Sequence, residues 1–488
     1  MRFLLTMLLV LSGSLVHSQQ STFSFSDSAI LHRLKTDIYM LASDSFQGRQ
    51  VGTKGDSLAC EYLVSRYREI GLEPRGEPGG SYLQRFSYKT IYHPPSGNYL
   101  YTDYDHYLYR TDFGMVAFSA NGKATGKLLN IGYGIFDSVS RVDDYTGKPE
   151  PAGRVLLMEL PLPDAISGDS LRRMELSVRN RLSEAFRRGA VAVLLWNSDT
   201  PGYKDLFDFK RTDTLSGKVI FVTEAVANRL KKLAGQSVHL NATVIRMKIE
   251  SNNLVGFVDN QATKTVILGA HFDHVGLNSR GVAKTGADDN ASGTALILEL
   301  ARYLKNRGEP TCNYLFIAFG AEEEGMVGSN YFCKHPVIPR DQVIFMCNFD
   351  MVGRLGAEGN RLTALGTATS PQWKEVYRKM PKFGFRLKKY KGASNFSDQV
   401  CFYKEKIPIF YLTTGMHSDY HTHRDRPERI NYTGMVQITR FTEEFITLAG
   451  QAGEIDFSKV SPWATLFSDL NYFIKQIGHM FEIPLQDW

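Results

Sequence analysis

The stretch that decides the fold runs from residue 265 to residue 293 and reads TVILGAHFDHVGLNSRGVAKTGADDNASG. Its first residues form a short apolar run, typical of a strand that is buried on both faces. Two polar groups follow, His271 to His274 and Asp288 to Asn290, and after them comes the helix-like run ALILELARYL. Imidazole nitrogens and carboxylate oxygens are the ligands of zinc in catalytic sites. This order of strand, ligand types and helix therefore indicates a metal-dependent hydrolase.

The same alternation of strand and helix continues on both sides of this stretch, from residue 253 to about residue 450. Apolar runs predict strands at 253–259, 265–270, 313–320, 343–349 and 407–414, and helices are expected at 293–306, 370–380 and 433–450. Strands that alternate with helices favour an α/β domain with a mostly parallel central sheet flanked by helices. We predict such a domain over residues 248–450.

Polar residues follow four of these strands at the point where each strand ends. Each signal alone is weak, because a single Asp often caps a helix and a Glu triplet is usually a solvated helix face. In an open α/β sheet, however, ligands bind in the crevice outside the carboxyl ends of the strands. The candidate residues at these strand ends are His271, Asp273, Glu322, Glu323, Glu324, Asp350, His417, Asp419, Tyr420, His421 and His423.

The rest of the chain divides by its pattern into four further segments. Residues 1–18 combine a basic start with an apolar core and predict a cleavable signal peptide, hence a secreted or periplasmic protein. Residues 27–85 read as two helices that belong to the α/β domain. Residues 86–247 read as a separate β-rich domain with few convergent acids or histidines, and residues 451–488 as an amphipathic tail.

Composition narrows the class of protein. The net charge of +6 is spread along the chain, which gives nucleic-acid binding little support. After residue 18 no apolar run is long enough for a stable membrane span. The five cysteines are odd in number, widely spaced and without a CxxC pair, so we expect packing residues with at most one or two disulfides.

Five segments in this order carry a resemblance to a known family: GAHFDHVG, GADDNASGTA, AFGAEEEGMVGS, NFDM and SDYHTHRD. Together they resemble the M28 family of zinc aminopeptidases, and LASDSFQGRQVGT is similar to the lead-in of that family. The resemblance covers about residues 27–85 and 253–450 and implies a zinc-exopeptidase-like fold. The middle block, with GRVLLMEL, RRGAVAVLLWN and KVIFVT, looks like an inserted protease-associated (PA) domain.

The resemblance also implies a site for two zinc ions per chain. Asp289 matches the carboxylate that bridges both ions, His271 and Asp350 match the ligands of one zinc, and Glu323 and His421 match those of the other. Glu322 matches the catalytic glutamate, Tyr420 a tyrosine that hydrogen-bonds the oxyanion, and Asp273 the acid that orients His271.

The sequence departs from the family pattern at a few positions. Gln399 stands where many members have a histidine, and Glu324 extends the usual glutamate pair to three. His274 and His417 are additional imidazoles, which we expect to lie outside the ligand set.

The function implied is that of a secreted aminopeptidase that removes N-terminal residues from peptides, with Glu322 as general base for a metal-activated water. Two alternatives remain open from the sequence. One is a glutaminyl-cyclase-like acyltransferase, which has the same fold with one zinc, and the other is a catalytically inactive binding protein.

Overall fold

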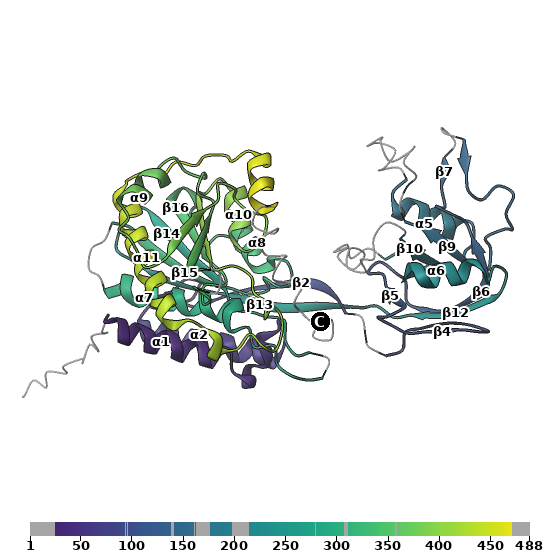
Figure 1. Cartoon of the computed structure of the whole chain (residues 1–488), viewed down its shortest axis with the longest axis horizontal. Coiled ribbons are helices and arrows are strands. Elements are labelled where there is room, and N and C mark those ends of the chain that lie inside the picture. Colours follow the sequence, from purple (N-terminus) through teal and green to yellow (C-terminus); the bar gives the residue numbers. More distant parts are fainter. Residues whose placement is uncertain are drawn as a thin grey trace, which may run out of the picture. The chain divides into compact units, whose positions relative to one another are not determined.

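The computed structural model describes residues 25–470 apart from 93, 95, 138–140, 161, 163–175, 198–213, 279, 307–310 and 357–358. The predicted signal peptide and the end of the predicted tail lie outside the described residues. The chain divides into two compact units (Figure 1). The first unit comprises Met1–Phe86 with Glu250–Trp488, and the second unit is Ser87–Ile249.

The first unit is built on a nine-stranded sheet with the order β1-β13-β15-β14-β16-β19-β17-β18, in which β2 also pairs with β13. The central pairs β15–β14, β14–β16 and β16–β19 are parallel, whereas β13 and β17 run antiparallel to β15 and β19. The mixed α/β class and its parallel centre, as predicted, are confirmed. The strands are β1 (Glu73–Pro74), β2 (Leu83–Tyr92), β13 (Ile245–Val258), β14 (Thr265–His271), β15 (Asn313–Phe319), β16 (Val343–Phe349), β17 (Arg361–Leu365), β18 (Arg386–Lys389) and β19 (Ile409–Thr413).

Helices cover both faces of this sheet (Figure 1). Successive residues of β14 alternate between the two faces: Val266 and Leu268 pack in one core cluster and Ile267 in the other. This alternation explains why the strand is apolar throughout. One cluster is completed by α1 (Asp27–Leu41), α2 (Lys54–Ile70), α7 (Gly293–Asn306), α9 (Trp373–Lys379) and α11 (Tyr432–Gln451), and the other by α8 (Val327–Lys334) and α10 (Gln399–Lys404).

The second unit is an eight-stranded mixed sheet with the order β4-β3-β12-β6-β9-β10-β11-β5. Two hydrophobic clusters lie within this unit, and they contain residues of α5 (Val178–Arg187) and α6 (Glu224–Lys231). The strands are β3 (Tyr99–Thr102), β4 (His106–Tyr107), β5 (Phe113–Met115), β6 (Gly122–Asn130), β9 (Val155–Glu159), β10 (Ala192–Trp196), β11 (Lys218–Val222) and β12 (Ser237–Ala242), with a small separate pair of β7 (Phe136–Asp137) and β8 (Val142–Asp143).

Short helical turns and one disulfide complete the first unit. The turns are η1 (Asp44–Arg49), η2 (Ala287–Ser292), η3 (Arg340–Gln342) and η4 (Pro427–Arg429). A disulfide joins Cys333 to Cys401, and Cys60, Cys312 and Cys347 are buried free thiols. Residues 462–470 are helical, and the hydroxyl of Ser468 accepts a hydrogen bond from the backbone of Gly392. Over the described part of the chain, no helix has both the length and the apolar character needed to cross a membrane.

Candidate metal centre

The carboxyl ends of the central parallel strands bring the predicted site residues together. β14 ends at His271, and the backbone just beyond β15 and β16 carries the next acids. The turn η2 and the loop after β19 supply the remaining groups from distant parts of the sequence. The residues brought together are His271, His274, Asp289, Glu323, Asp350 and His421, which form two groups that share Asp289.

The first cluster consists of His271, Asp289 and Asp350. His271 Nε2 lies 3.4 Å from Asp350 Oδ1 and 3.5 Å from Asp289 Oδ1. All three residues are buried. Three such groups converging on one point form a candidate position for a metal ion.

The second cluster consists of His274, Asp289, Glu323 and His421. His421 Nε2 lies 3.0 Å from Asp289 Oδ2 and 3.1 Å from Glu323 Oε1. His274 Nδ1 lies 2.9 Å from Glu323 Oε1 and 3.6 Å from Asp289 Oδ2. Asp289 therefore presents one carboxylate oxygen to each cluster, which is the arrangement of a bridging ligand.

The donor atoms of these clusters fit zinc. Asp289 Oδ2 and His421 Nε2 are buried and only 3.0 Å apart, yet neither makes a hydrogen bond to any described residue. Buried polar atoms normally have hydrogen-bond partners. Two such atoms that face one another without a hydrogen bond therefore indicate a site for a bound ion. Imidazole and carboxylate are the donors that zinc takes.

The pKa values of the clustered side chains are shifted because several ionisable groups are buried close together. Burial, and then the neighbouring Glu323, raises the pKa of Asp289. Burial lowers the pKa of His421, but the carboxylates of Glu323 and Asp289 outweigh it and bring that pKa to about 10. The carboxylates repel one another in a dry environment, and divalent cations would offset that repulsion.

Asp273 holds the backbone that carries two of these acids. Its carboxylate accepts hydrogen bonds from the backbone N–H groups of Glu322, at 3.0 Å, and Glu323, at 3.2 Å. His271 Nδ1 lies 3.3 Å from the carbonyl oxygen of Asp273 and 3.8 Å from its Oδ1. The contacts of Asp273 thus reach both the imidazole and the glutamate pair.

A cavity of about 170 Å³ opens beside the first cluster. His271, Asp289, Asp350 and Glu322 line it together with Tyr420, whose ring stacks on that of His421 with centroids 3.8 Å apart. Burial raises the pKa of Tyr420 well above its usual value, so the phenol keeps its proton and remains a hydrogen-bond donor. The other wall is largely apolar and consists of Met351, Phe396, Ser397, Tyr411 and Met416.

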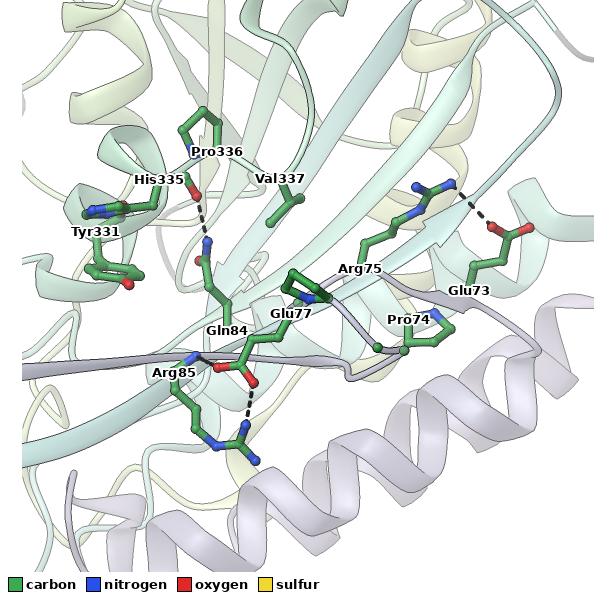
Figure 2. A pocket seen from close by; sticks show the side chains of 14 residues that line it. Glu73, Pro74, Arg75, Glu77, Gln84, Arg85, Tyr331, His335, Pro336 and Val337 are labelled. Atoms are coloured by element: carbon green, nitrogen blue, oxygen red, sulfur yellow. Dashed lines mark hydrogen bonds and ion pairs between the residues drawn. The ribbon is translucent and has the colours of Figure 1, made fainter.

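A larger cavity of about 710 Å³ lies elsewhere in the first unit, near β1 and the end of α8 (Figure 2). Its side chains bind one another: Arg75 pairs with Glu73, Arg85 pairs with Glu77, and Gln84 donates to the carbonyl of His335. No residue of the two clusters lines this larger cavity, and Glu322 does not line it either. We therefore place the functional site at the smaller cavity.

The structure gives the additional imidazoles different surroundings. His274, expected outside the ligand set, lies in the second cluster. His417 Nε2 lies 3.1 Å from Asp288 Oδ2 and belongs to neither cluster. Gln399 is buried, where its side chain donates to the carbonyl of Phe396 and accepts from Asn348, so it links two segments of the fold.

Residues 285–289, which carry the shared ligand Asp289, are called the metal loop below. Two residues that hold the backbone of this loop were not singled out from the sequence. Asp425 accepts hydrogen bonds from the backbone N–H groups of Asp288, at 3.0 Å, and Asp289, at 3.1 Å. The buried side chain of Arg49 donates to the carbonyls of Thr285 and Gly286 on the same loop. The only available signal for them was their position inside the segments GRQVGT and SDYHTHRD.

A parallel α/β sheet with a carboxylate and imidazole centre at its carboxyl edge defines a class of metal-dependent hydrolase folds. The sequence model of Peptidase family M28 matches residues 253–446, so this part of the chain is similar to that family.

Individual proteins show the same similarity. Aminopeptidase YwaD of Bacillus subtilis is 29% identical over 282 residues, covering 54% of this chain and 57% of that protein. An aminopeptidase of Pseudomonas aeruginosa is 25% identical over 327 residues, covering 64% of this chain and 55% of that protein. The chain thus spans a little over half the length of these two relatives.

Solved structures share the fold over most of the chain. An aminopeptidase from Aneurinibacillus sp. strain AM-1 has a TM-score of 0.59 at 19% identity, covering 89% of this chain and 99% of its own. BSAP, a zinc aminopeptidase from Bacillus subtilis, has a TM-score of 0.57 at 21% identity, covering 88% of this chain and 98% of its own. At these identities the likeness concerns the fold.

Proposed function

We propose that this protein is a zinc-dependent aminopeptidase that removes N-terminal residues from peptides. The observation that carries the proposal is the position of Asp289, which presents one oxygen to each of two clusters beside the cavity that Glu322 lines. The match of residues 253–446 to the M28 peptidase model and the similarity to proteins named aminopeptidases support the reaction class.

The groups that line the cavity would have different roles in peptide hydrolysis. Zinc held by these residues would polarise the scissile carbonyl and lower the pKa of the attacking water. Glu322 would take the proton of that water and deliver it to the leaving amine. The phenol of Tyr420 would donate a hydrogen bond to the oxygen on which negative charge develops.

The apolar wall of the cavity suggests the substrate side chain. Met351, Phe396, Tyr411 and Met416 line a space of about 170 Å³. A space of this size and character would hold one apolar side chain. We therefore expect faster cleavage after an N-terminal Leu or Met than after an N-terminal Asp or Lys.

The proposal also covers export of the protein from the cell interior and the nature of the second unit. We infer secretion or periplasmic export from the signal-like residues 1–18, and the disulfide between Cys333 and Cys401 suits an oxidising compartment. The second unit is proposed as a PA-like domain, on the strength of its sequence segments and its β-rich sheet. N-terminal sequencing of the mature protein tests the first inference, since cleavage is expected close to residue 18.

The decisive test uses chromogenic aminoacyl substrates with zinc-loaded protein. Glu322→Gln is expected to lower kcat by about 10²- to 10⁴-fold, because it removes the base but keeps the shape. Zinc content should stay the same, since Glu322 belongs to neither cluster. The matched control is Glu324→Gln, which neutralises a neighbouring glutamate that is also outside both clusters.

Unchanged hydrolysis by Glu322→Gln would show that the base is misassigned, and hydrolysis of no substrate would remove the peptidase proposal. The same preparation separates the alternatives. Two zinc ions per chain with release of free amino acids support the aminopeptidase. One zinc with cyclisation of an N-terminal Gln would support a glutaminyl cyclase instead.

A further inference from the structure

The two metal positions of the proposed enzyme are surrounded by different numbers of protein groups. We propose that His274 is a direct metal ligand, so that the second cluster holds its ion with four protein ligands. The first cluster would hold its ion with three and keep a position open toward the cavity. This inference rests on the proposed zinc site and adds a ligand and an order of affinity to it.

The distances within the second cluster support a four-ligand centre. Zinc bonds of about 2.0–2.1 Å in a tetrahedron place neighbouring ligand atoms about 3.3 Å apart. His274 Nδ1 lies 2.9 Å from Glu323 Oε1 and 3.6 Å from Asp289 Oδ2, while His421 Nε2 lies 3.1 Å and 3.0 Å from the same two atoms. The four distances lie on either side of the tetrahedral value.

The burial of His274 points to the same role. The residue is 1% exposed, and its Nδ1 faces the acids of the cluster. Gly286 makes room for the ring, since a Cβ at that position would lie 2.6 Å from His274 Cγ and 2.1 Å from the carbonyl oxygen of Asp289. The rings of His274 and His421 approach edge to face, with centroids 5.3 Å apart. The fold thus directs two imidazoles at the same pair of carboxylates.

The cavity distinguishes the two positions. All three members of the first cluster, His271, Asp289 and Asp350, line the cavity. Of the second cluster only the shared Asp289 does so, whereas His274 and Glu323 do not. Zinc sites with four protein ligands are typically structural, and catalytic sites leave a position for water or substrate. The ion of the first cluster would therefore face the substrate, and the ion of the second would bind more tightly.

A different role for His274 makes a different prediction. Its Nδ1–H could simply donate a hydrogen bond to Glu323, as the 2.9 Å distance allows. The imidazole would then position a ligand without binding the ion. Loss of such an outer partner typically weakens metal binding by about 10- to 100-fold and leaves the ligand count unchanged.

The test compares cobalt spectra in a background with one metal position. Asp350→Ala removes a ligand of the first cluster, and Co²⁺ is added at one equivalent. The remaining ion is expected to show the intense visible bands of four-coordinate Co²⁺. Adding His274→Asn should replace them by the weak bands of a hydrated, higher-coordinate ion. In the otherwise unchanged protein, His274→Asn should weaken one of two zinc dissociation constants by more than about 100-fold and leave the other within a few-fold.

The matched control is His335→Asn, which removes an exposed imidazole that stacks on Tyr331 and belongs to neither cluster. It should change neither the spectrum nor either dissociation constant.

Several outcomes would overturn the inference. An unchanged cobalt spectrum in the His274→Asn variant would show that His274 is not a ligand. Weak bands already present in the Asp350→Ala protein would exclude a four-ligand centre even if the His274 variant fails to fold. If His274→Asn weakened the binding of both zinc ions equally, the substitution would be acting through the shared ligand Asp289. Failure of the proposed function is distinct, because the parent protein would then bind no zinc or hydrolyse no peptide.

Discussion

Arg49 is the residue that ties the N-terminal lead-in to the metal loop. Its fully buried guanidinium donates hydrogen bonds of 2.6–2.9 Å to four backbone carbonyls, those of Leu41, Phe272, Thr285 and Gly286. Burial lowers the pKa of Arg49 only to about 10, so the side chain stays charged at neutral pH. A single side chain therefore fixes three segments that are far apart in the sequence.

Replacement of Arg49 should lower the stability of the fold. Arg49→Met would leave four buried carbonyls without their donor, and the free energy of unfolding should fall by about 3 kcal/mol or more. Arg49→Lys keeps the charge but lacks the planar fork of donors, so it should recover only part of the loss. Chemical denaturation of the zinc-free protein measures the effect. Full recovery by lysine would show that charge, rather than hydrogen-bond geometry, is what matters.

Asp56 gives the fold a pH dependence that is separate from the metal site. Burial raises the pKa of its carboxyl from 3.8 to about 6, against a single hydrogen bond from the backbone of Gly52. The folded state therefore binds this proton more tightly than the unfolded state. The stabilising contribution is complete below pH 3.8 and is lost as the pH rises through about 6.

Asp56→Asn should remove this dependence. Relative to the parent, the free energy of unfolding of the variant should rise by about 2 kcal/mol between pH 4 and pH 7. Urea unfolding of both proteins across that range measures the difference. A difference that does not change with pH would contradict the assigned pKa.

At the scale of elements, a disulfide joins α8 to α10, the two helices that pack in one hydrophobic cluster of the first unit. Cys333 lies near the end of α8 and Cys401 lies in α10, 68 positions further along the sequence. Both cysteines pack in the same hydrophobic cluster as Phe332 and Phe402. The bond closes a long loop of the chain, so it restricts the unfolded state strongly.

Removing this bond should lower stability by about 4 kcal/mol on the loop-closure estimate. The change is the double substitution Cys333→Ser and Cys401→Ser, and the measurement is the free energy of unfolding of zinc-free protein. The parent protein unfolded with a reducing agent serves as the control, because it should lose the same stabilisation. A loss confined to the double variant would point to packing of the serines instead.

At the scale of the whole molecule, the chain has two units with separate cores. The hydrophobic clusters of the second unit contain only residues between Leu100 and Val244, and those of the first unit contain none of these. A domain of this size can bury enough apolar surface to fold alone. The division of the chain therefore has an energetic meaning as well as a geometric one.

Residues 87–249 expressed alone are expected to unfold in one cooperative transition. The denaturant slope should match the surface of a domain of that length. Circular dichroism and tryptophan fluorescence should report the same midpoint, with Trp196 as the buried probe. A gradual loss of signal, or different midpoints for the two probes, would show that the unit depends on the rest of the chain.

The amino-acid sequence by itself determined the central sheet and the set of groups at its edge. β14, β15 and β16 are nearly continuous apolar runs because both of their faces are buried, and such runs are visible without a structure. β17 and β18 were missed, since both are short and β18, RLKK, is partly exposed and carries no apolar period. The five predicted ligands lie together because parallel strands present their carboxyl ends on one side.

Only the tertiary structure decided which further groups join that edge. Sequence alone left open whether His274 lies beside the ligands or at the surface; its buried ring lies against Glu323 in the second cluster, where the absent side chain of Gly286 leaves it room. The pairing of Cys333 with Cys401, and the bonds from Arg49 to the metal loop, join residues far apart in sequence. Periodicity records which face of an element is buried, whereas the direction of a loop side chain depends on contacts that no local pattern encodes.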